Sequence, residues 1–179
     1  DYYHCTAFSF AVIHNYQVDL VCSVGTKQYQ GTESVLPSSP MMAASISKMV
    51  TAVGAIKLVH QGVLDLDTDV HEYFRDDYVL PANEGLSNKV TLRQIFGHLA
   101  GLNVPGFGGY QKGQPIPTLR QVLDGVYPAK TEQLRGVRPQ NTLVLSTPDN
   151  PQGPYSGGGY CLAQKVISDV TGKHFADVM

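Results

Sequence analysis

The sequence has few charged residues, and the two signs are nearly balanced. Aspartate, glutamate, lysine and arginine make up 16% of the chain, and the formal net charge is −2. There is neither a basic run nor an acidic tail. Proteins that bind nucleic acid or an anionic membrane surface usually carry a basic patch or tail. The composition therefore argues against both kinds of partner.

Long hydrophobic runs are also lacking. The longest apolar stretch, around Met49 to Ile56, is much shorter than the roughly 20 residues needed to span a bilayer. We therefore expect no membrane span.

Cysteine is scarce, with only Cys5, Cys22 and Cys161. Their spacing fits neither a zinc site nor a Cys-x-x-Cys redox pair. Cys22 lies in a strand-like run and Cys161 in a helix-like run, so we expect both to be buried as small apolar residues. One disulfide is possible. We expect no metal site and no cofactor.

An acidic segment, Asp65-Leu-Asp-Thr-Asp69, raises the question of calcium. An EF-hand loop needs glycine at its sixth position and glutamate at its twelfth, and these positions hold Val70 and Asp76. The match fails. We expect Asp67 or Asp69 to cap a short helix at Val70 to Phe74 instead.

The first part of the chain has the pattern of a β-hairpin. Ala7 to Ile13 is typical of a buried strand, His14 to Gln17 of a turn, and Val18 to Val24 of a second strand. Two strands alone are marginally stable. We therefore expect further strands to complete the sheet.

The remainder of the 179-residue chain is mainly helical in its pattern. Capping boxes of the form Thr-x-x-Gln and helix-ending glycines mark the boundaries. We expect a long loop over 103–117, rich in Gly and Pro, to border a site, and we expect 127–154 to be irregular. The expected helices are a buried one over 45–60 that ends at Gly62, one from Thr91 to about His98 or Leu99, one from Thr118 to Gly125, and one from about Gly159 to Val170, ended by Gly172.

Ser45 and Lys48 form a Ser-x-x-Lys motif at the start of the first helix. Residues three apart share a helix face, which brings the lysine amine near the serine hydroxyl. A serine nucleophile needs a nearby base, and lysine serves as one when burial or a neighbouring cation lowers its pKa. The motif alone is weak, because a solvated Ser/Lys pair has the same spacing. The apolar neighbours of Lys48 favour the buried alternative.

Tyr155 precedes a run of three glycines, Gly157 to Gly159, at the start of the last helix. Glycines allow close backbone approach, so the tyrosine can direct its hydroxyl into a cleft. A nearby lysine would lower its pKa and make it a general base. The alternative is a tyrosine that only packs against the helix start.

Four stretches, taken together and in order, resemble the serine β-lactamase-like and penicillin-binding-protein-like family. They are Ala-Ser45-Ile-Ser-Lys48, Gly62-Val-Leu-Asp-Leu-Asp67, Val90-Thr-Leu-Arg-Gln-Ile-Phe-Gly-His-Leu-Ala-Gly-Leu102 and Tyr155-Ser-Gly-Gly-Gly-Tyr160. The branch that looks most similar contains class C β-lactamases, family VIII esterases and D-amino-acid peptidases. The resemblance implies an α+β fold, with an antiparallel sheet flanked by helices and a helical subdomain.

The resemblance implies an acyl-enzyme hydrolase of esters, amides or β-lactams. Ser45 would be the nucleophile and one oxyanion donor, Lys48 the proton acceptor or relay, and Tyr155 the second base. His98 matches a recurrent family position and would tie the loop to the helix. The family link also favours a periplasmic or secreted location.

The chain departs from the family pattern at two points. The second motif, usually Tyr-x-Asn, has Gly157 at the position of the substrate-contacting asparagine, so the resemblance implies that Gly157 is a substrate-binding residue. The third motif, a Lys/His-x-Gly triplet on a strand, is not found after Tyr155. Gly157 favours esters over β-lactams. The alternative is a β-lactamase-like scaffold or interaction subunit without turnover.

The expected organisation is part of one catalytic module over 1–179. Residues 1–30 would supply the first two strands, and residues 41–179 a mainly helical subdomain. The expected partners are a small-molecule or peptide substrate and the remaining strands of the module, carried by a second chain or a further segment.

Overall fold

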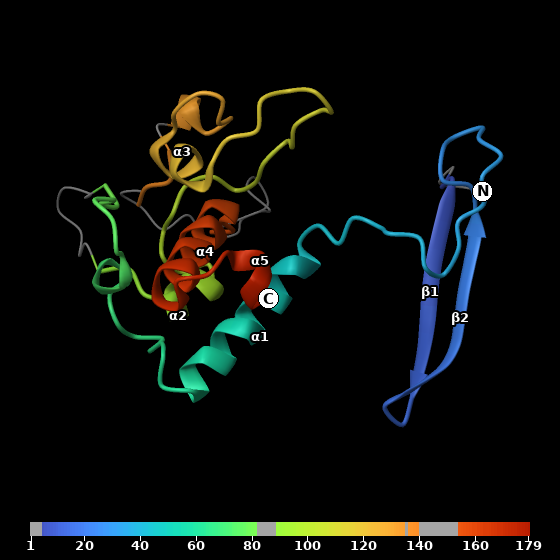
Figure 1. Cartoon of the computed structure of the whole chain (residues 1–179), viewed down its shortest axis with the longest axis horizontal. Helices are drawn as coiled ribbons and strands as arrows, with labels where there is room; N and C mark the ends of the chain where they lie inside the picture. Colours follow the sequence, from blue (N-terminus) through green and yellow to red (C-terminus); the bar gives the residue numbers. More distant parts are fainter. Residues whose placement is uncertain (1–4, 82–88, 135, 140–153) are drawn as a thin grey trace. The chain divides into compact units, whose positions relative to one another are not determined.

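The computed structural model describes residues 5–81, 89–134, 136–139 and 154–179. These residues form two compact units, divided between Ala44 and Ser45. Figure 1 draws the β-hairpin of the first unit and the helices of the second.

The first unit contains an antiparallel hairpin of β1 (Ala7–His14) and β2 (Gln17–Gly25). Asn15 and Tyr16 form its turn with φ values of 49° and 62°. Two consecutive positive φ values match the right-handed twist of the flanking strands, which explains so tight a connection. The predicted hairpin is confirmed.

One face of the hairpin is entirely apolar. Residue pairs Phe8–Val24, Phe10–Cys22 and Val12–Leu20 lie opposite each other across the strands. The rings of the two phenylalanines lie 6.0 Å apart, centroid to centroid. The other face is more polar and contains a 2.9 Å hydrogen bond between the Ser9 and Ser23 hydroxyls.

The burial expected for the strand over Ala7 to Ile13 is not found in the chain as described, and the hairpin has an exposed apolar face, in line with the expectation that it needs further strands. The large apolar side chains of the hairpin are 43% to 68% exposed. The residues concerned are Phe8, Phe10, Val12, Ile13, Val18, Leu20, Val21 and Val24. Alternating apolar residues predict that one face of a sheet packs against other elements, but they do not show where those elements are. The described sheet has two strands only, and its apolar face stays exposed.

Helix α1 (Ile46–His60) has the predicted bounds but not the predicted burial. Thr51, Ala55 and Leu58 are its buried residues, at the spacing of one helix face. The other faces leave Met49, Val50, Val53 and Ile56 between 47% and 65% exposed. The prediction of a buried helix was wrong. Helix α1 has apolar residues on all its faces, but only one face packs against other described residues.

Helix α4 (Gly157–Thr171) lies at the centre of the second unit, and the other elements pack on it (Figure 1). Leu162, Ala163, Val166 and Ile167 on α4 are fully buried. The surrounding elements are α1, η1 (Val70–Tyr73), α2 (Leu92–Phe96), α3 (Leu119–Asp124) and α5 (Phe175–Val178), with η2 (Glu132–Leu134) between α3 and α4 in sequence. The sequence had not indicated α5 or η2.

Local capping signals fix most of the helix ends. Both capping boxes form, at Thr91 and at Thr118. Asp69 caps η1 by accepting the His71 backbone N–H at 3.1 Å. Gly172 ends α4 in the left-handed conformation, as expected.

Two boundaries differ from the prediction. Helix α2 ends at Phe96, before His98, which is itself left-handed at φ 57°. Helix α4 begins at Gly157, two residues earlier than expected, because Ser156 caps it through the Gly159 N–H. Of the segment expected to be irregular, 140–153 lies outside the described residues.

The expectation of buried cysteines was only partly right. Cys22 and Cys161 are half-buried and Cys5 is exposed, and all three thiols are free. Burial raises the pKa of the Cys161 thiol to about 11. A thiol with so high a pKa is protonated at neutral pH and is not nucleophilic.

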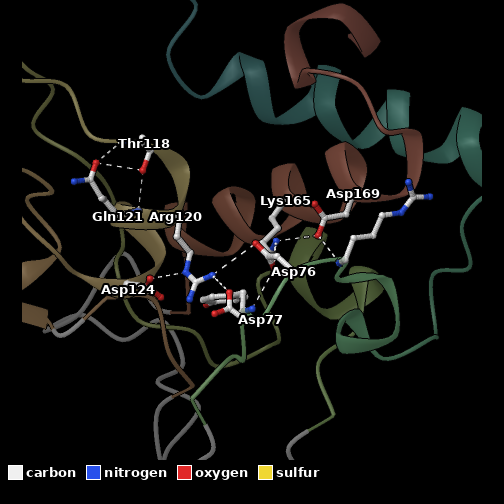
Figure 2. Close-up of polar contacts among 10 residues, drawn as sticks. Asp76, Asp77, Thr118, Arg120, Gln121, Asp124, Lys165 and Asp169 are labelled. Carbon is white, nitrogen blue, oxygen red and sulfur yellow. Dashed lines mark hydrogen bonds and ion pairs between the residues drawn. The ribbon is translucent and has the colours of Figure 1, made fainter.

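A network of ion pairs ties the segment before Tyr78 to α3 and α4 (Figure 2). Lys165 on α4 is 6% exposed and donates to Asp76 at 2.8 Å and to Asp169 at 2.9 Å. Arg120 on α3 pairs with Asp77 at 2.8 Å and Asp124 at 2.5 Å. The network therefore cross-links elements that are distant in the sequence.

Replacing Lys165 with methionine is expected to lower the unfolding free energy by about 3 kcal/mol, because it leaves the half-buried Asp169 without its cation. Hydrogen bonding to Lys165 is also the foremost reason that the pKa of Asp76 is lowered. A lowered carboxylate pKa stabilises the fold above the unfolded-state pKa, and this contribution is lost as pH falls through the folded pKa. The deficit of the variant should therefore shrink in acid.

Urea unfolding of the complete protein at pH 7 and near pH 3 measures both effects. Lys173→Met is the matched control, since Lys173 is exposed and lies two turns further along the same segment. Equal stability of the two variants at pH 7 would show that the buried cation contributes nothing.

Candidate active site

Ser45 is the N-cap residue of α1, but its side chain makes no capping hydrogen bond. Serine at this position usually accepts a backbone N–H of the first turn. Here the Ser45 hydroxyl instead lies 2.8 Å from the Tyr155 hydroxyl and accepts a hydrogen bond from Lys48 Nζ at 3.3 Å. The helix start thus presents a free hydroxyl between two polar side chains.

The three side chains predicted as catalytic are brought together. Ser45 and Lys48 share a face of α1, as their spacing predicted. Tyr155 comes from the segment just before α4, 110 residues further along the chain. A hydroxyl–hydroxyl contact across this sequence distance is a product of the tertiary fold and not of local geometry.

Lys48 lies among aromatic rings. Its Nζ atom is 4.9 Å from the centroid of the Tyr155 ring and 5.5 Å from that of Tyr160. Cation–π contacts at these distances hold an ammonium group in place. The sequence had suggested that the Lys48 side chain is buried, but it is only half-buried. The reason is that its apolar neighbours on α1 face outward.

The pKa of Tyr155 is lowered from its ordinary value. The main cause is its hydrogen bond with Lys48, followed by that with Ser45 and by the positive charge of Lys48. These contacts favour the phenolate over the phenol. Tyr155 is therefore the group of this site whose basic form the surroundings stabilise.

Hydrogen bonds hold the start of α4 against the loop that follows Leu102. Ser156 Oγ donates to the Asn103 carbonyl at 2.7 Å, Gly157 N–H to the Pro105 carbonyl at 3.1 Å, and Gly158 N–H to the Val104 carbonyl at 3.0 Å. The expected loop does border the site. Because these N–H groups are occupied, the α4 N-terminus does not offer them to a substrate.

Gly157, expected to contact substrate, lies in this hydrogen-bonded region and is buried. A Cβ atom at this position would meet the Pro105 carbonyl at 3.1 Å, and the Phe107 ring at 3.4 Å. Its φ is not positive. A larger residue at 157 would therefore press on the loop, so the neighbouring backbone favours glycine.

Gly158 is more crowded still, with its Cβ position 2.9 Å from Val104 Cβ and 3.0 Å from a Val137 methyl carbon. We expect Gly158→Ala to lower the unfolding free energy by about 1–3 kcal/mol through overpacking. Gly106→Ala is the control, because its Cβ position has no neighbour within 4 Å and its φ is not positive. Thermal or urea unfolding compares them. An unchanged unfolding free energy for Gly158→Ala would mean that the neighbouring loop moves to accommodate the added methyl group at little cost.

Two further residues complete the site. The His98 ring lies 4.3 Å from that of Tyr155, and its Nδ1 accepts the Ser156 backbone N–H at 3.1 Å. This agrees with the expectation that His98 ties loop to helix. The sequence reasoning missed Tyr160, whose ring faces both Lys48 and His98. Its position in the first turn of the helix after Tyr155 was the available signal.

The described residues contain no cluster of three or more histidine, cysteine, aspartate or glutamate side chains that could hold a metal ion. Among the same residues, no helix has both the length and the apolar character that crossing a bilayer requires.

The fold and the Ser45–Lys48–Tyr155 arrangement define the class as β-lactamase/transpeptidase-like, with helices and an antiparallel hairpin. The β-lactamase family model matches residues 2–179, and the chain belongs to this family. The resemblance inferred from the sequence motifs is thereby confirmed. Comparison with curated proteins gave no match.

Solved structures show the same fold at low sequence identity. The β-lactamase/D-alanine carboxypeptidase of Yersinia pestis, complexed with citrate, is 22% identical with a TM-score of 0.65, covering 97% of this chain and 45% of that one. The octameric penicillin-binding protein homologue of Pyrococcus abyssi is 20% identical with a TM-score of 0.66, covering 96% and 36%. FmtA from Staphylococcus aureus is 20% identical with a TM-score of 0.63, covering 95% and 41%. The chain thus spans less than half the length of each structure.

Proposed function

We propose that the complete protein is a serine hydrolase that forms an acyl-enzyme on Ser45. One observation carries the proposal, the 2.8 Å contact between the Ser45 and Tyr155 hydroxyls beside Lys48. An activated serine needs a base within hydrogen-bond reach and a third group that orients the base. Tyr155 meets the first requirement and Lys48 the second. Family membership supports the same class of chemistry.

In the proposed first step, Ser45 Oγ attacks a carbonyl carbon while its proton passes to the Tyr155 phenolate. The proton then passes to the leaving alcohol or amine as the carbonyl–heteroatom bond breaks, leaving the acyl group on Ser45. Water, deprotonated by the same tyrosine, attacks the acyl carbon. The bond from that carbon to Ser45 Oγ then breaks as Tyr155 gives the proton to Oγ, and a carboxylic acid is released. No oxidation or reduction takes place, and the enzyme returns to its initial state.

Lys48 has two roles in this scheme. Its hydrogen bond and positive charge stabilise the phenolate form of Tyr155, which the lowered pKa of that group reflects. Its Nζ also donates to Ser45 Oγ at 3.3 Å, which fixes the direction of the nucleophile. We assign the proton transfer to Tyr155, since Lys48 lacks the deep burial that a neutral lysine base requires.

The remaining strands of the module are the proposed partner of this chain, as a second chain or a further segment. The apolar face of the hairpin, formed by Phe8, Phe10, Val12, Leu20 and Val24, supports this proposal because it is exposed. Such a surface is costly to leave in water. The backbone N–H of Ser45 is the proposed first oxyanion donor, and the added strands would supply the second.

Substrates are proposed to be short-chain esters in preference to β-lactams or D-alanyl peptides. The family pattern Tyr-x-Asn places a side-chain amide where this chain has Gly157. A site without that amide cannot form its hydrogen bond to a substrate amide and so does not favour amide substrates. The crowded surroundings of Gly157 support glycine as the fitting residue here. The Yersinia pestis neighbour, described as a β-lactamase/D-alanine carboxypeptidase, supports acyl transfer in general but not this preference.

The test compares kcat/KM for p-nitrophenyl butyrate with that for nitrocefin on the complete protein. We expect the ester to be the better substrate. A ratio that favours nitrocefin would contradict the ester preference and leave the hydrolase proposal intact. Absence of turnover and of covalent labelling with a fluorophosphonate would instead favour the alternative, a scaffold without activity.

A further inference from the structure

His98 is placed to control the position of Tyr155 without itself touching Ser45. Its Nδ1 accepts the Ser156 backbone N–H at 3.1 Å, one residue after Tyr155. Its ring lies against the Tyr155 ring in a tilted arrangement, with 4.3 Å between centroids and a 36° angle between planes. The two contacts act on the same short segment, one on its backbone and one on its side chain.

We propose that His98, in its neutral form, is a positioning residue that holds the Tyr155 hydroxyl against Ser45, so that protonation of His98 switches the site off. This inference rests on the proposed hydrolase function. It assigns to His98 a controlling role that goes beyond a structural link between loop and helix.

The effect of protonation follows from the role of Nδ1 as a hydrogen-bond acceptor. A ring nitrogen that accepts an N–H carries no proton, so the neutral imidazole must have its proton on Nε2. Protonation of His98 would add a proton to Nδ1, so that an Nδ1–H would point at the Ser156 N–H. The hydrogen bond would then become a repulsive contact, and the segment that carries Tyr155 would have to move. A displacement of about 1 Å at a catalytic group can cost about 100-fold in rate.

The surroundings of His98 favour its neutral form. Lys48 on α1 adds positive charge, and the rings of Tyr155 and Tyr160 lie 4.3 Å and 5.5 Å from the His98 ring, centroid to centroid. Arg93, the charged residue of α2, pairs with Asp67 instead. Burial first, and the charge of Lys48 second, lower the pKa of His98. The site is therefore intact at neutral pH, and activity is lost as pH falls through the lowered His98 pKa.

Two variants separate the contacts that His98 makes. His98→Asn keeps an acceptor oxygen close to the Nδ1 position, does not titrate, and tolerates the left-handed backbone at φ 57°. His98→Phe keeps a ring against Tyr155 but has no acceptor. The control for backbone strain is His98→Gly, which accepts the same φ with neither contact.

The kinetic test measures kcat and KM for p-nitrophenyl butyrate from pH 4 to 9 on the complete protein. We expect His98→Asn to lose less kcat at neutral pH than His98→Phe, because it keeps the acceptor. We expect it also to lack the loss of activity that wild type shows as pH falls through the lowered His98 pKa, while the rise that Tyr155 causes at higher pH remains. We expect His98→Phe to lose kcat by about 10- to 100-fold with KM little changed. A purely structural role would lower the melting temperature of both variants and leave their pH profiles like that of wild type, which would overturn the proposal.

A second readout does not depend on turnover. In the complete protein labelled with 15N-serine and 15N-histidine, the N–H···N bond predicts a scalar coupling between the Ser156 amide nitrogen and His98 Nδ1. The coupling should vanish as His98 is protonated. Its absence at pH 7.5 would overturn the positioning role even in an active enzyme. Its presence in a protein without hydrolase activity would refute the proposed function alone.

Discussion

Replacing Ser45 with alanine is expected to abolish ester hydrolysis and fluorophosphonate labelling while leaving the fold unchanged. The proposed nucleophile is lost, and no other described residue takes its place between Tyr155 and Lys48. The Ser45 hydroxyl makes no capping hydrogen bond, so its removal does not weaken the start of α1. The unfolding free energy should stay within about 0.5 kcal/mol of wild type.

Thr118→Ala is the matched control for this variant. Thr118 is also an N-cap residue, but its side chain accepts the Gln121 N–H and belongs to a capping box. Its removal should cost about 1 kcal/mol of stability and leave labelling intact. The two variants thus have opposite profiles. Hydrolysis by Ser45→Ala at the wild-type rate would remove Ser45 from the mechanism.

Replacing Tyr155 with phenylalanine is expected to lower kcat/KM by about 100- to 10,000-fold, the usual contribution of a general base. The ring and its contact with His98 are retained, and only the hydroxyl 2.8 Å from Ser45 is lost. In wild type the base form of Tyr155 increases as pH rises through its lowered pKa. The rise of kcat/KM over that range should therefore be missing in the variant.

Tyr160→Phe provides the comparison. Tyr160 faces Lys48 at 5.5 Å, but among the described residues its hydroxyl makes a long 3.4 Å hydrogen bond to the Phe96 carbonyl and none to Ser45. The ring stays beside Lys48 in this variant, so activity should remain. Steady-state kinetics over pH 6 to 11 distinguishes the two tyrosines. An equal loss in both variants would point to packing around Lys48 and not to a base at Tyr155.

The parts of the fold that local chemistry determines could be read from the sequence. The turn at Asn15 and Tyr16, the capping boxes at Thr91 and Thr118, and the end of α4 at Gly172 each depend on a few adjacent residues. Such signals do not depend on what packs around them. The same holds for the approach of Lys48 to Ser45 within one helix turn.

Burial could not be predicted in the same way. The apolar residues of α1 and of the hairpin indicate surfaces that favour packing against other residues. A sequence does not say whether those packing partners lie among the described residues. Val53 was expected inside and is 65% exposed. The burial expected for Lys48 failed for the same reason, and with it the argument that desolvation makes the lysine the base.

The site itself was only partly accessible to sequence reasoning. Tyr155 was found through its glycine-rich surroundings and a family resemblance, because no local rule connects residues 110 positions apart. The Nδ1 acceptor on His98 depends on how α2 packs on α4, and the contact of Tyr160 with Lys48 depends on how α1 packs on α4. Tertiary packing, and not residue type, decides such contacts.

The most direct test of the central claim is to trap the acyl-enzyme. The complete protein would be mixed with p-nitrophenyl butyrate, quenched in acid within milliseconds and digested with trypsin. Mass spectrometry with fragmentation then locates the butyryl group. We expect a single adduct on peptide 28–48, at Ser45. An adduct on another residue, or turnover with no covalent adduct at any quench time, would contradict this expectation.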